Sequence, residues 1–207
     1  MIPLEDAQSH VMKNIKTLND ENVHLLQGRN RAITEPILSN ESIPPFDNTA
    51  VDGYAVKAID TKGATQETPI SLTVLETIAA GKPPTFAIQS GECSKIMTGA
   101  PIPDGADAVV MVERTEQQEN GSVVAIEEEV SKGQHIRRSG EDLEPGDLVI
   151  PQGTILNAAH LGLLASLGIY QITTVRIPTV GVFSTGDELI EGSQELKPGQ
   201  IRDSNRF

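Results

Sequence analysis

The sequence has no tryptophan, and aromatic residues make up 3% of its 207 residues. A hydrophobic core must therefore be built from Ile, Leu, Val and Ala, which a chain of this length can bury in quantity. There is one cysteine, Cys93, so an intrachain disulfide is excluded. Cys93 lies in an expected strand at 93–97, and we interpret it as a small core residue rather than a nucleophile.

Positive charge is also scarce, because 16 Lys and Arg against 29 Asp and Glu give a net charge of −13 at pH 7. This balance argues against nucleic acid and anionic membranes as partners, since both need a basic surface. An anionic ligand would depend on local Arg, Lys and backbone N–H donors. The sequence shows no signal peptide and no apolar run long enough to span a bilayer, so we expect a cytoplasmic protein.

The most informative stretch is residues 43–56, Ile-Pro-Pro-Phe-Asp-Asn-Thr-Ala-Val-Asp-Gly-Tyr-Ala-Val, here called the signature segment. Its two prolines exclude a helix interior, and Asp47-Asn48 and Asp52-Gly53 both favour turns. A stiff loop would present Asp47 and Asp52 in fixed directions, as a ligand or metal site requires. A tight turn between two strands explains the same residues equally well.

Hydrophobic periodicity predicts two helices. Apolar residues recur at steps of three and four from Leu4 to Leu18, which indicates an amphipathic helix. A second helix is predicted to begin at the N-cap Asn157 and to run to Leu167, with Gly168 placed to end it. Because the second helix is nearly apolar, we expect it to be buried.

Short strands joined by turns are predicted in the middle of the chain, at 71–75, 94–97, 108–112 and 122–126. The stretch at 119–121, Glu-Asn-Gly, is typical of a hairpin. A buried strand is also predicted at 178–184, as at the start of an open α/β sheet, where ligands gather at the carboxyl ends of strands. Since one strand cannot form such a domain, we expect the chain to be the N-terminal part of a longer protein.

Several motifs follow one another along nearly the whole chain. They are PPFDNTAVDGYAV at 44–56, KIMTGAPIP at 95–103, GADAVV at 105–110, IRRSGED at 136–142, FSTGDEL at 183–189 and GQIRDSNR at 199–206. In this order they resemble the molybdopterin molybdenumtransferases of the MoeA type, a family that includes the gephyrin E-domain. Several motifs in one order are far more specific than a single glycine-rich motif.

The resemblance implies an α+β, multi-domain fold. A mixed α/β N-terminal domain would be discontinuous, at 1–51 and 133–174, with a β-rich domain inserted at 52–132. Residues 175–207 would begin a truncated α/β domain that binds molybdopterin. Members of the family are elongated homodimers whose active site lies between the β-rich domain of one subunit and the α/β domain of the other.

The resemblance also implies a transferase of molybdenum cofactor biosynthesis. Such enzymes insert molybdenum from molybdate into adenylylated molybdopterin, in a Mg²⁺-dependent step that hydrolyses the anhydride and releases AMP. This chemistry requires a cation that neutralises phosphate charge and fixed donors for two anions. The implied partners are a second copy of the protein and a molybdopterin adenylyltransferase. The 207-residue chain alone is expected to lack part of the site.

Four acids lie in loop contexts and are candidate ligands of Mg²⁺, which takes oxygen donors. They are Asp52, Asp142, Glu188 and Asp203. Residues on the solvated surface explain the same pattern in a chain with 29 acids, and without the resemblance that explanation is favoured.

The residues that could donate hydrogen bonds to an anion also have purely structural explanations. Arg137 and Arg138 suit a phosphate or another oxyanion, but they could equally be a surface pair that balances nearby acids. Thr98, with the N–H groups around it, could hold an anion or cap a proline-bounded turn. Ser184 could contact an anion or a ribose, or belong to a strand-to-helix connection.

The resemblance implies roles for seven residues. The catalytic residues are Asp52 and Asp142; the substrate-binding residues are Thr98, Arg137, Ser184 and Glu188; the metal ligands are Asp52, Glu188 and Asp203. Arg138 competes with Arg137 for contact with the ligand.

Two other classes of function remain open at this point. The first is a non-catalytic dimerisation or scaffold module, as the gephyrin relatives also serve, although a scaffold has no need of a carboxylate loop. The second and weaker one is a sugar or nucleotide hydrolase, which would not bind molybdate together with Mg²⁺.

Overall fold

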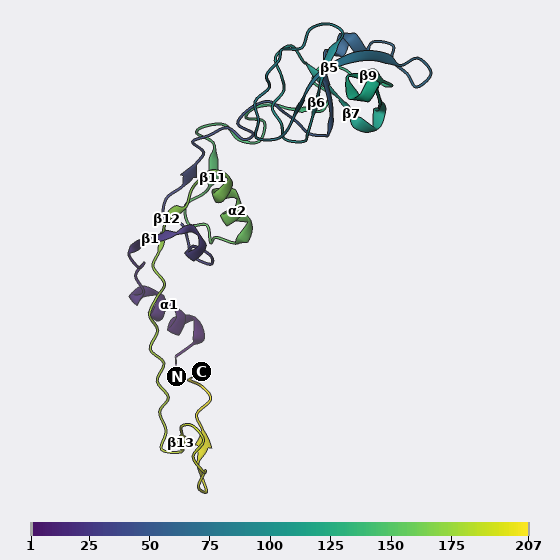
Figure 1. Ribbon diagram of the computed structural model, residues 1–207. Coiled ribbons are helices and arrows are strands. Elements are labelled where there is room, and N and C mark those ends of the chain that lie inside the picture. The colour runs from purple at the N-terminus through teal and green to yellow at the C-terminus, as the bar shows by residue number, and fades with distance from the viewer. Residues whose placement is uncertain (1, 207) are drawn as a thin grey trace. The chain divides into compact units, whose positions relative to one another are not determined.

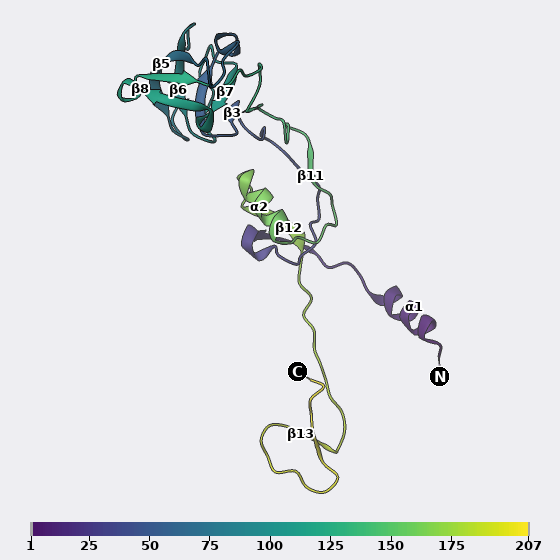
Figure 2. The ribbon, with the colours of Figure 1, turned by 90° about the vertical axis from the view of Figure 1, so that its right-hand side faces the viewer.

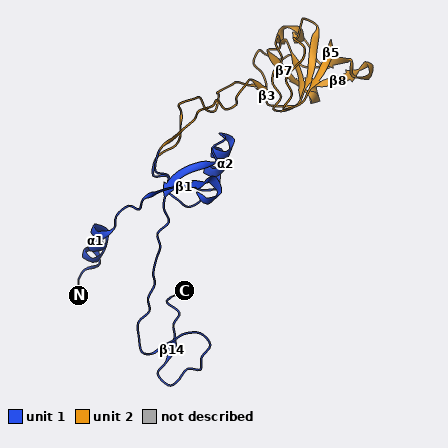
Figure 3. Ribbon diagram, turned by 60° about the vertical axis from the view of Figure 1, so that its left-hand side comes forward, with its two compact units in different colours: residues 1–35, 152–207 blue, residues 36–151 orange. Residues whose placement is uncertain are grey.

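The computed structural model describes residues 2–206 and divides into two compact units (Figure 3). Unit 1 comprises Met1–Glu35 and Gln152–Phe207, and unit 2 comprises Pro36–Pro151. The fold is α+β and consists mostly of strands. The expected three-domain division remains a prediction, and its end residues Met1 and Phe207 lie outside the described residues. Within the part described, none of the helices has the length and apolar character needed to cross a membrane.

Unit 2 is built on a six-stranded sheet with the strand order β7-β4-β6-β5-β9-β8 (Figures 1 and 2). Its strands are β4 (Gly53–Val56), β5 (Ile70–Ile78), β6 (Glu92–Ile96), β7 (Ala108–Met111), β8 (Thr115–Gln118) and β9 (Val123–Ile126). All neighbours are antiparallel except β5 and β6, which are parallel. The strands predicted at 71–75, 94–97, 108–112 and 122–126 are confirmed, and so is the hairpin at 119–121.

Alternate residues of the central strands pack on opposite faces of this sheet. All four residues of β4 are buried. Tyr54 and Val56 belong to one hydrophobic cluster, and Ala55 between them belongs to another. This is the two-residue period of a strand that is covered on both sides. The core rests on aliphatic residues, as the composition required.

One end of the sheet brings together four chain segments that are distant in sequence. The ends of the parallel strands β5 and β6 meet there, because Ile78 lies opposite Ile96. Strand β4 begins at the same end, since Gly53 lies opposite Ile96 and Met111. The residue before β4, Asp52, therefore lies beside the residues that follow β5, β6 and β7.

Four shorter strands complete unit 2. Strand β3 (Asn48–Thr49) pairs antiparallel with β10 (Ile136–Arg137), so the signature segment lies beside the IRRSGED motif. Strand β2 (Ile37–Leu38) pairs antiparallel with β11 (Leu148–Ile150). Single turns of 3₁₀ helix occur at Ala58–Thr61, Val112–Arg114 and Glu119–Gly121.

In unit 1, strands β1 (Asp20–His24) and β12 (Gln171–Val175) pair antiparallel, with a 3₁₀ turn at Leu25–Gln27. Helix α2 (Ala158–Ser166) has the predicted N-cap, because the Asn157 side chain accepts a 3.1 Å hydrogen bond from the His160 N–H. Gly168 follows the helix with a φ of +68°, as expected of the residue that ends it.

The structure corrects two expectations about helices. Helix α1 spans Leu4–Asn14 and not the full stretch to Leu18, because Ile15 has extended backbone angles. Within α2 the buried residue is Leu164, so the helix is not buried on all sides despite its apolar composition.

The strand predicted at 178–184 is wrong for the described structure. No strand is present between residues 176 and 188, and Phe183 is 90% exposed. A strand needs a neighbour to pair its N–H and C=O groups, and no described strand lies beside this segment. Further on, β13 (Leu189–Ile190) and β14 (Ile201–Arg202) form a small parallel pair.

Candidate functional site

The structure brings Asp52 and Thr98 together across 46 residues of sequence. The Asp52 Oδ1 accepts hydrogen bonds from the Thr98 N–H, at 2.7 Å, and from the Thr98 hydroxyl, at 2.8 Å. Both bonds end on the same oxygen, and among the described residues Oδ2 has no hydrogen-bond partner. The carboxylate is therefore held by one oxygen while the other remains available to a ligand.

The turn at 97–100, here called the Thr98 turn, explains why Thr98 can hold a carboxylate. The Ala100 N–H bonds the Met97 carbonyl at 2.9 Å, and Gly99 has a φ of +80°. These are features of a type II turn, which needs glycine at its third position. From the sequence, Thr98 could hold an anion or cap a turn; within this chain its hydroxyl and N–H both bond the carboxylate of Asp52.

Asp52 is ionised at neutral pH. The Thr98 N–H lowers the pKa of its carboxyl group most, and the Thr98 hydroxyl and the charge of Lys95 lower that pKa further. An exposed carboxylate of this kind has the charge and the oxygen atom that Mg²⁺ prefers.

Thr49, which the sequence patterns did not single out, links the Thr98 turn to the signature segment. Its side chain is buried, its N–H bonds the Ala100 carbonyl at 3.1 Å, and its carbonyl accepts from the Gly99 N–H at 2.9 Å. Its hydroxyl donates a hydrogen bond to the Val51 carbonyl at 2.7 Å. Threonine hydroxyls often form such local turns with the backbone two residues further on, and the threonine itself is the sequence signal for the turn. Thr49 therefore fixes Asp52 relative to the Thr98 turn.

Two arginines of the IRRSGED motif pair with different acids. Arg137 bonds Asp142 at 2.5 Å and Glu141 at 3.1 Å. Arg138 bonds Asp47 at 2.5 Å. The predicted catalytic Asp142 and the predicted substrate contact Arg137 are thus in direct contact. Both arginines have carboxylate partners, so the contacts within the chain favour neither one as the residue that contacts the ligand.

Asp47 is a second residue of the signature segment with a positioning role. Its carboxylate accepts hydrogen bonds from the Ser139 N–H, at 2.8 Å, and from the Arg138 guanidinium. Its own carbonyl accepts from the Ile102 N–H at 3.0 Å. Asp47 therefore connects the IRRSGED motif with the segment that follows the Thr98 turn.

Asp47→Asn is expected to lower stability at pH 7 and to matter less in acid. The Ser139 N–H and the Arg138 guanidinium lower the pKa of Asp47 from its usual 3.8. A carboxyl group with a lowered folded-state pKa stabilises the fold above the unfolded pKa and loses this contribution as pH falls through the folded pKa. In urea unfolding the difference between wild type and variant should be below about 1 kcal/mol at pH 7, since the pair is exposed and screened. It should shrink below pH 3.8, and a difference independent of pH would contradict this account.

In unit 1 the structure pairs two more predicted residues. The Ser184 hydroxyl bonds the Asp203 carboxylate at 2.9 Å across 19 residues. The Asp203 side chain is 5% exposed and also accepts from the Asn205 N–H at 3.2 Å. Glu188 lies next to β13, and its carbonyl accepts from the Ile201 N–H at 2.8 Å. Its exposed carboxylate is the freer of the two predicted acids in this unit.

The predicted metal ligands are divided between the units, with Asp52 in unit 2 and Glu188 and Asp203 in unit 1. Across residues 2–206, no group of three or more His, Cys, Asp or Glu side chains is placed to hold a metal ion. Asp52 nevertheless fits Mg²⁺ as one ligand, because this ion keeps several waters and takes one or two carboxylates together with substrate phosphates.

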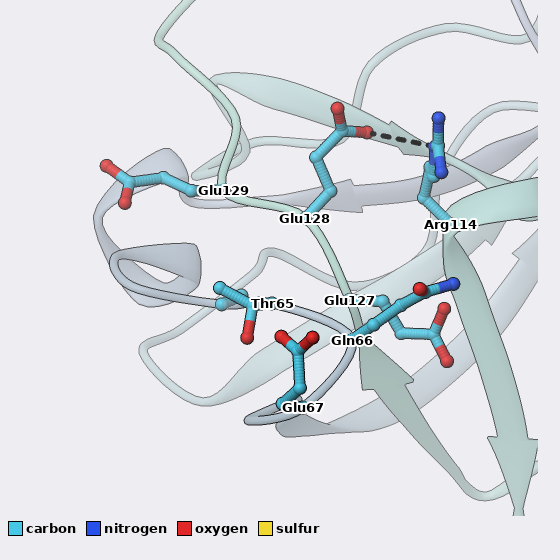
Figure 4. Close-up of a pocket in the computed structure, with 8 residues that line it drawn as sticks. Thr65, Gln66, Glu67, Arg114, Glu127, Glu128 and Glu129 are labelled. Atoms are coloured by element: carbon cyan, nitrogen blue, oxygen red, sulfur yellow. Dashed lines mark ion pairs between the residues drawn. The ribbon is translucent and has the colours of Figure 1, made fainter.

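Two other features do not contribute to the site. Cys93 is fully buried in β6, and burial raises the pKa of its thiol to about 12, which confirms its interpretation as a core residue. A recess of about 380 Å³ on unit 2 has four glutamates among its eight lining residues, with Arg114 3.8 Å from Glu128 (Figure 4). It contains none of the predicted site residues, and its negative charge opposes an anionic substrate.

Comparison with known proteins places the chain in a family. Residues 2–168 match the family model of the MoeA N-terminal region (domain I and II). The chain is 41% identical over 207 residues to a protein of Mycobacterium tuberculosis named molybdopterin molybdenumtransferase 2, covering 99% of this chain and 50% of the relative. It is 40% identical over 208 residues to a molybdopterin molybdenumtransferase of Haemophilus influenzae, covering 100% of this chain and 50% of the relative.

A solved structure agrees with the sequence relatives. A molybdopterin biosynthesis MoeA protein from Pyrococcus horikoshii is 36% identical and superposes with a TM-score of 0.86, covering 99% of this chain and 54% of that one. The chain thus spans about half the length of the relatives it matches.

Proposed function

The chain belongs to the MoeA family of molybdopterin molybdenumtransferases, and on this premise we propose that the complete protein inserts molybdenum from molybdate into adenylylated molybdopterin. In the proposed reaction one bond of the phosphoric anhydride is hydrolysed. The oxygen of water completes one phosphate, the bridging oxygen stays with the other, and AMP is released. Molybdenum is left on the dithiolene of molybdopterin.

The contact between Asp52 and Thr98 is the observation that carries the proposal. It presents an ionised, exposed carboxylate with one oxygen fixed by the Thr98 turn and one available. Such a group can hold a cation or orient water in a constant position, which lowers the reorganisation that the reaction requires. Asp142 would act through Arg137, since their 2.5 Å contact orients the guanidinium for an anion.

Mg²⁺ would be held by Asp52 in this unit, and Glu188 and Asp203 are the proposed ligands from unit 1. When bound, the ion would neutralise phosphate charge and polarise the phosphoryl group. Thr98, Arg137, Ser184 and Glu188 are the proposed contacts to substrate. The hydrogen bond from the Ser184 hydroxyl to the Asp203 carboxylate supports a role for these two residues as a pair.

We propose that the active protein is a homodimer in which the β-rich domain of one subunit completes the site of the other. Within the described residues, α1 has no buried residue, and Leu4, Val11 and Met12 are each more than half exposed. An isolated helix of 11 residues is marginal in water, so this apolar surface suits burial against a second subunit. The discontinuous N-terminal domain, the inserted β-rich domain and the truncated α/β domain are the proposed organisation. A molybdopterin adenylyltransferase is the proposed supplier of substrate.

Complementation tests the proposed function. The complete gene and a gene for residues 1–207 would be expressed separately in a strain that lacks its own molybdenum insertase. We expect the complete gene to restore a molybdenum-dependent reductase to at least about a hundred times the background. We expect residues 1–207 to remain at background, because the described residues from 176 to 206 form one pair of two-residue strands, β13 and β14.

Solubility and sedimentation of both products are the controls. If the complete protein is soluble and sediments as a dimer but does not restore the reductase, the insertase proposal is wrong and a scaffold role is favoured. If it restores the reductase as a monomer, the shared site is wrong and the rest of the proposal stands.

A further inference from the structure

An apolar pocket of about 340 Å³ lies on unit 2. It is lined by Phe46, Gly81, Lys82, Pro83, Pro84 and Pro101. Two of these residues belong to the motifs of the candidate site, since Phe46 precedes Asp47 and Pro101 follows the Thr98 turn. The sequence motifs and the comparisons assign no role to this pocket.

The topology of the sheet explains why the pocket lies there. The segment 79–84 follows β5, and the Thr98 turn follows β6. Because β5 and β6 are parallel, both segments leave the sheet at the same end, and the Met97 N–H bonds the Ile78 carbonyl at 3.0 Å. Phe46 reaches the same place because Asn48 pairs with Pro101.

The walls of the pocket are held by the backbone on each side. In segment 79–84 the Lys82 N–H bonds the Ala79 carbonyl at 3.1 Å, across Gly81 with a φ of +80°. The segment is anchored further on, where the Glu76 carboxylate accepts from the Thr85 and Phe86 N–H groups at 2.8 and 3.0 Å. Since proline side chains have little freedom to lose, such a pocket binds at low entropic cost.

The residues that line the pocket indicate which class of ligand it would bind. An exposed phenylalanine ring and three proline rings offer flat apolar surface, on which an aromatic ring packs favourably. Lys82 is the one charged lining residue, in a chain with a net charge of −13, and no ion pair of its ammonium group is found in residues 2–206. The volume lies at the lower end of the range of small-molecule sites, which suits one fused ring system with an attached group.

We propose that this pocket binds a fused heteroaromatic ring of a phosphate-bearing ligand, with the ring against Phe46 and the prolines and the phosphate near Lys82. This inference rests on the proposed function, because the substrate there carries two such rings, the pterin and the adenine. Phe46 and Lys82 line the same pocket, so one ligand can meet both side chains. Phe46 and Lys82 are thus specificity residues of the site.

Direct binding to the complete protein tests this assignment, with one probe for each ring. The pterin probe is 6-hydroxymethylpterin phosphate, followed by its own fluorescence. The adenine probe is AMP, followed by calorimetry. For the probe whose ring occupies the pocket, we expect Phe46→Ala to raise Kd about tenfold, from the loss of aromatic packing. We expect Lys82→Gln to raise Kd about threefold and to weaken its dependence on salt.

Ile59→Ala and Lys62→Gln are the matched controls, because both side chains are exposed on unit 2 and neither lines the pocket. Both should leave Kd within about twofold of wild type. Circular dichroism would check that Phe46→Ala folds. Lys82→Gln, on an exposed loop, repeats the test with little risk to folding.

The assignment is overturned if neither probe binds, or if Phe46→Ala and Lys82→Gln leave the Kd of both probes unchanged. A change for the pterin probe alone identifies the pterin as the occupant, and a change for AMP alone identifies the adenine. If the pocket variants bind normally while the complete gene restores the reductase, the pocket assignment fails and the insertase proposal stands. Failure of complementation together with loss of all probe binding would contradict both the pocket assignment and the insertase proposal.

Discussion

Asp52→Ala in the complete protein is expected to abolish cofactor production while leaving the fold intact. Asp52 is exposed, and its side chain contacts Thr98 at the surface, so its loss removes no buried contact. Removal of a catalytic acid or of a cation ligand typically costs 10²–10⁴-fold in rate. The measurement is the molybdenum-dependent reductase activity of a complemented insertase-deficient strain, with the unfolding midpoint of the purified variant beside it.

Asp52→Asn separates the charge of this residue from its contact with Thr98. The amide oxygen can still accept the Thr98 N–H and hydroxyl bonds, but the negative charge is gone. If the charge holds the cation, Asp52→Asn should be nearly as inactive as Asp52→Ala. Asp104→Asn is the matched control, because it removes an exposed carboxylate from another turn of unit 2 and should retain full activity. Normal activity of Asp52→Ala would favour a scaffold role and would exclude Asp52 from the reaction.

Gly53→Ala is expected to destabilise unit 2 by about 3 kcal/mol, the upper range for overpacking of a core. Gly53 begins β4, and a Cβ at this position would lie 2.0 Å from the Val110 carbonyl oxygen and 2.9 Å from its carbon. These atoms belong to the backbone of β7, so the clash cannot be relieved by turning a side chain. Urea denaturation measures the loss, and faster hydrogen exchange in β4 and β7 would locate it.

Gly162→Ala is the control, because the same substitution at this position is expected to stabilise the protein. This glycine lies in α2, and a Cβ there would meet no atom within 4 Å. Since alanine is favoured over glycine in helices, we expect a gain of about 0.5–1 kcal/mol. Equal effects at Gly53 and Gly162 would show that the close approach of β7 to β4 is not what requires glycine at Gly53. If Gly53→Ala is stable but inactive, the displacement of Asp52 alone would explain its effect.

Local patterns predicted those elements whose stability depends on neighbours in sequence. Asn157 and Gly168 were identified as the limits of a helix, because a cap and a left-handed glycine act within one turn. The pattern of short apolar runs bounded by turn residues predicted β5, β6, β7 and β9. It failed at 178–184, where an apolar run is present and no described strand pairs with it. It also failed to identify β4, because the turn-forming residues before Gly53 obscured the strand that follows.

The sequence by itself determined the family and the acidic and aliphatic character of the chain, and it predicted Asp52, Thr98, Arg137 and Asp142 among the site residues. Each of these depends on residue types in a fixed order. The tertiary structure decided which of the residues meet. Asp52 reaches Thr98 because β4 pairs with β6, and the pocket at Phe46 forms because β5 runs parallel to β6. Strand pairing joins residues far apart in sequence through backbone hydrogen bonds that are alike for nearly all residues, so no local pattern reveals which strands pair.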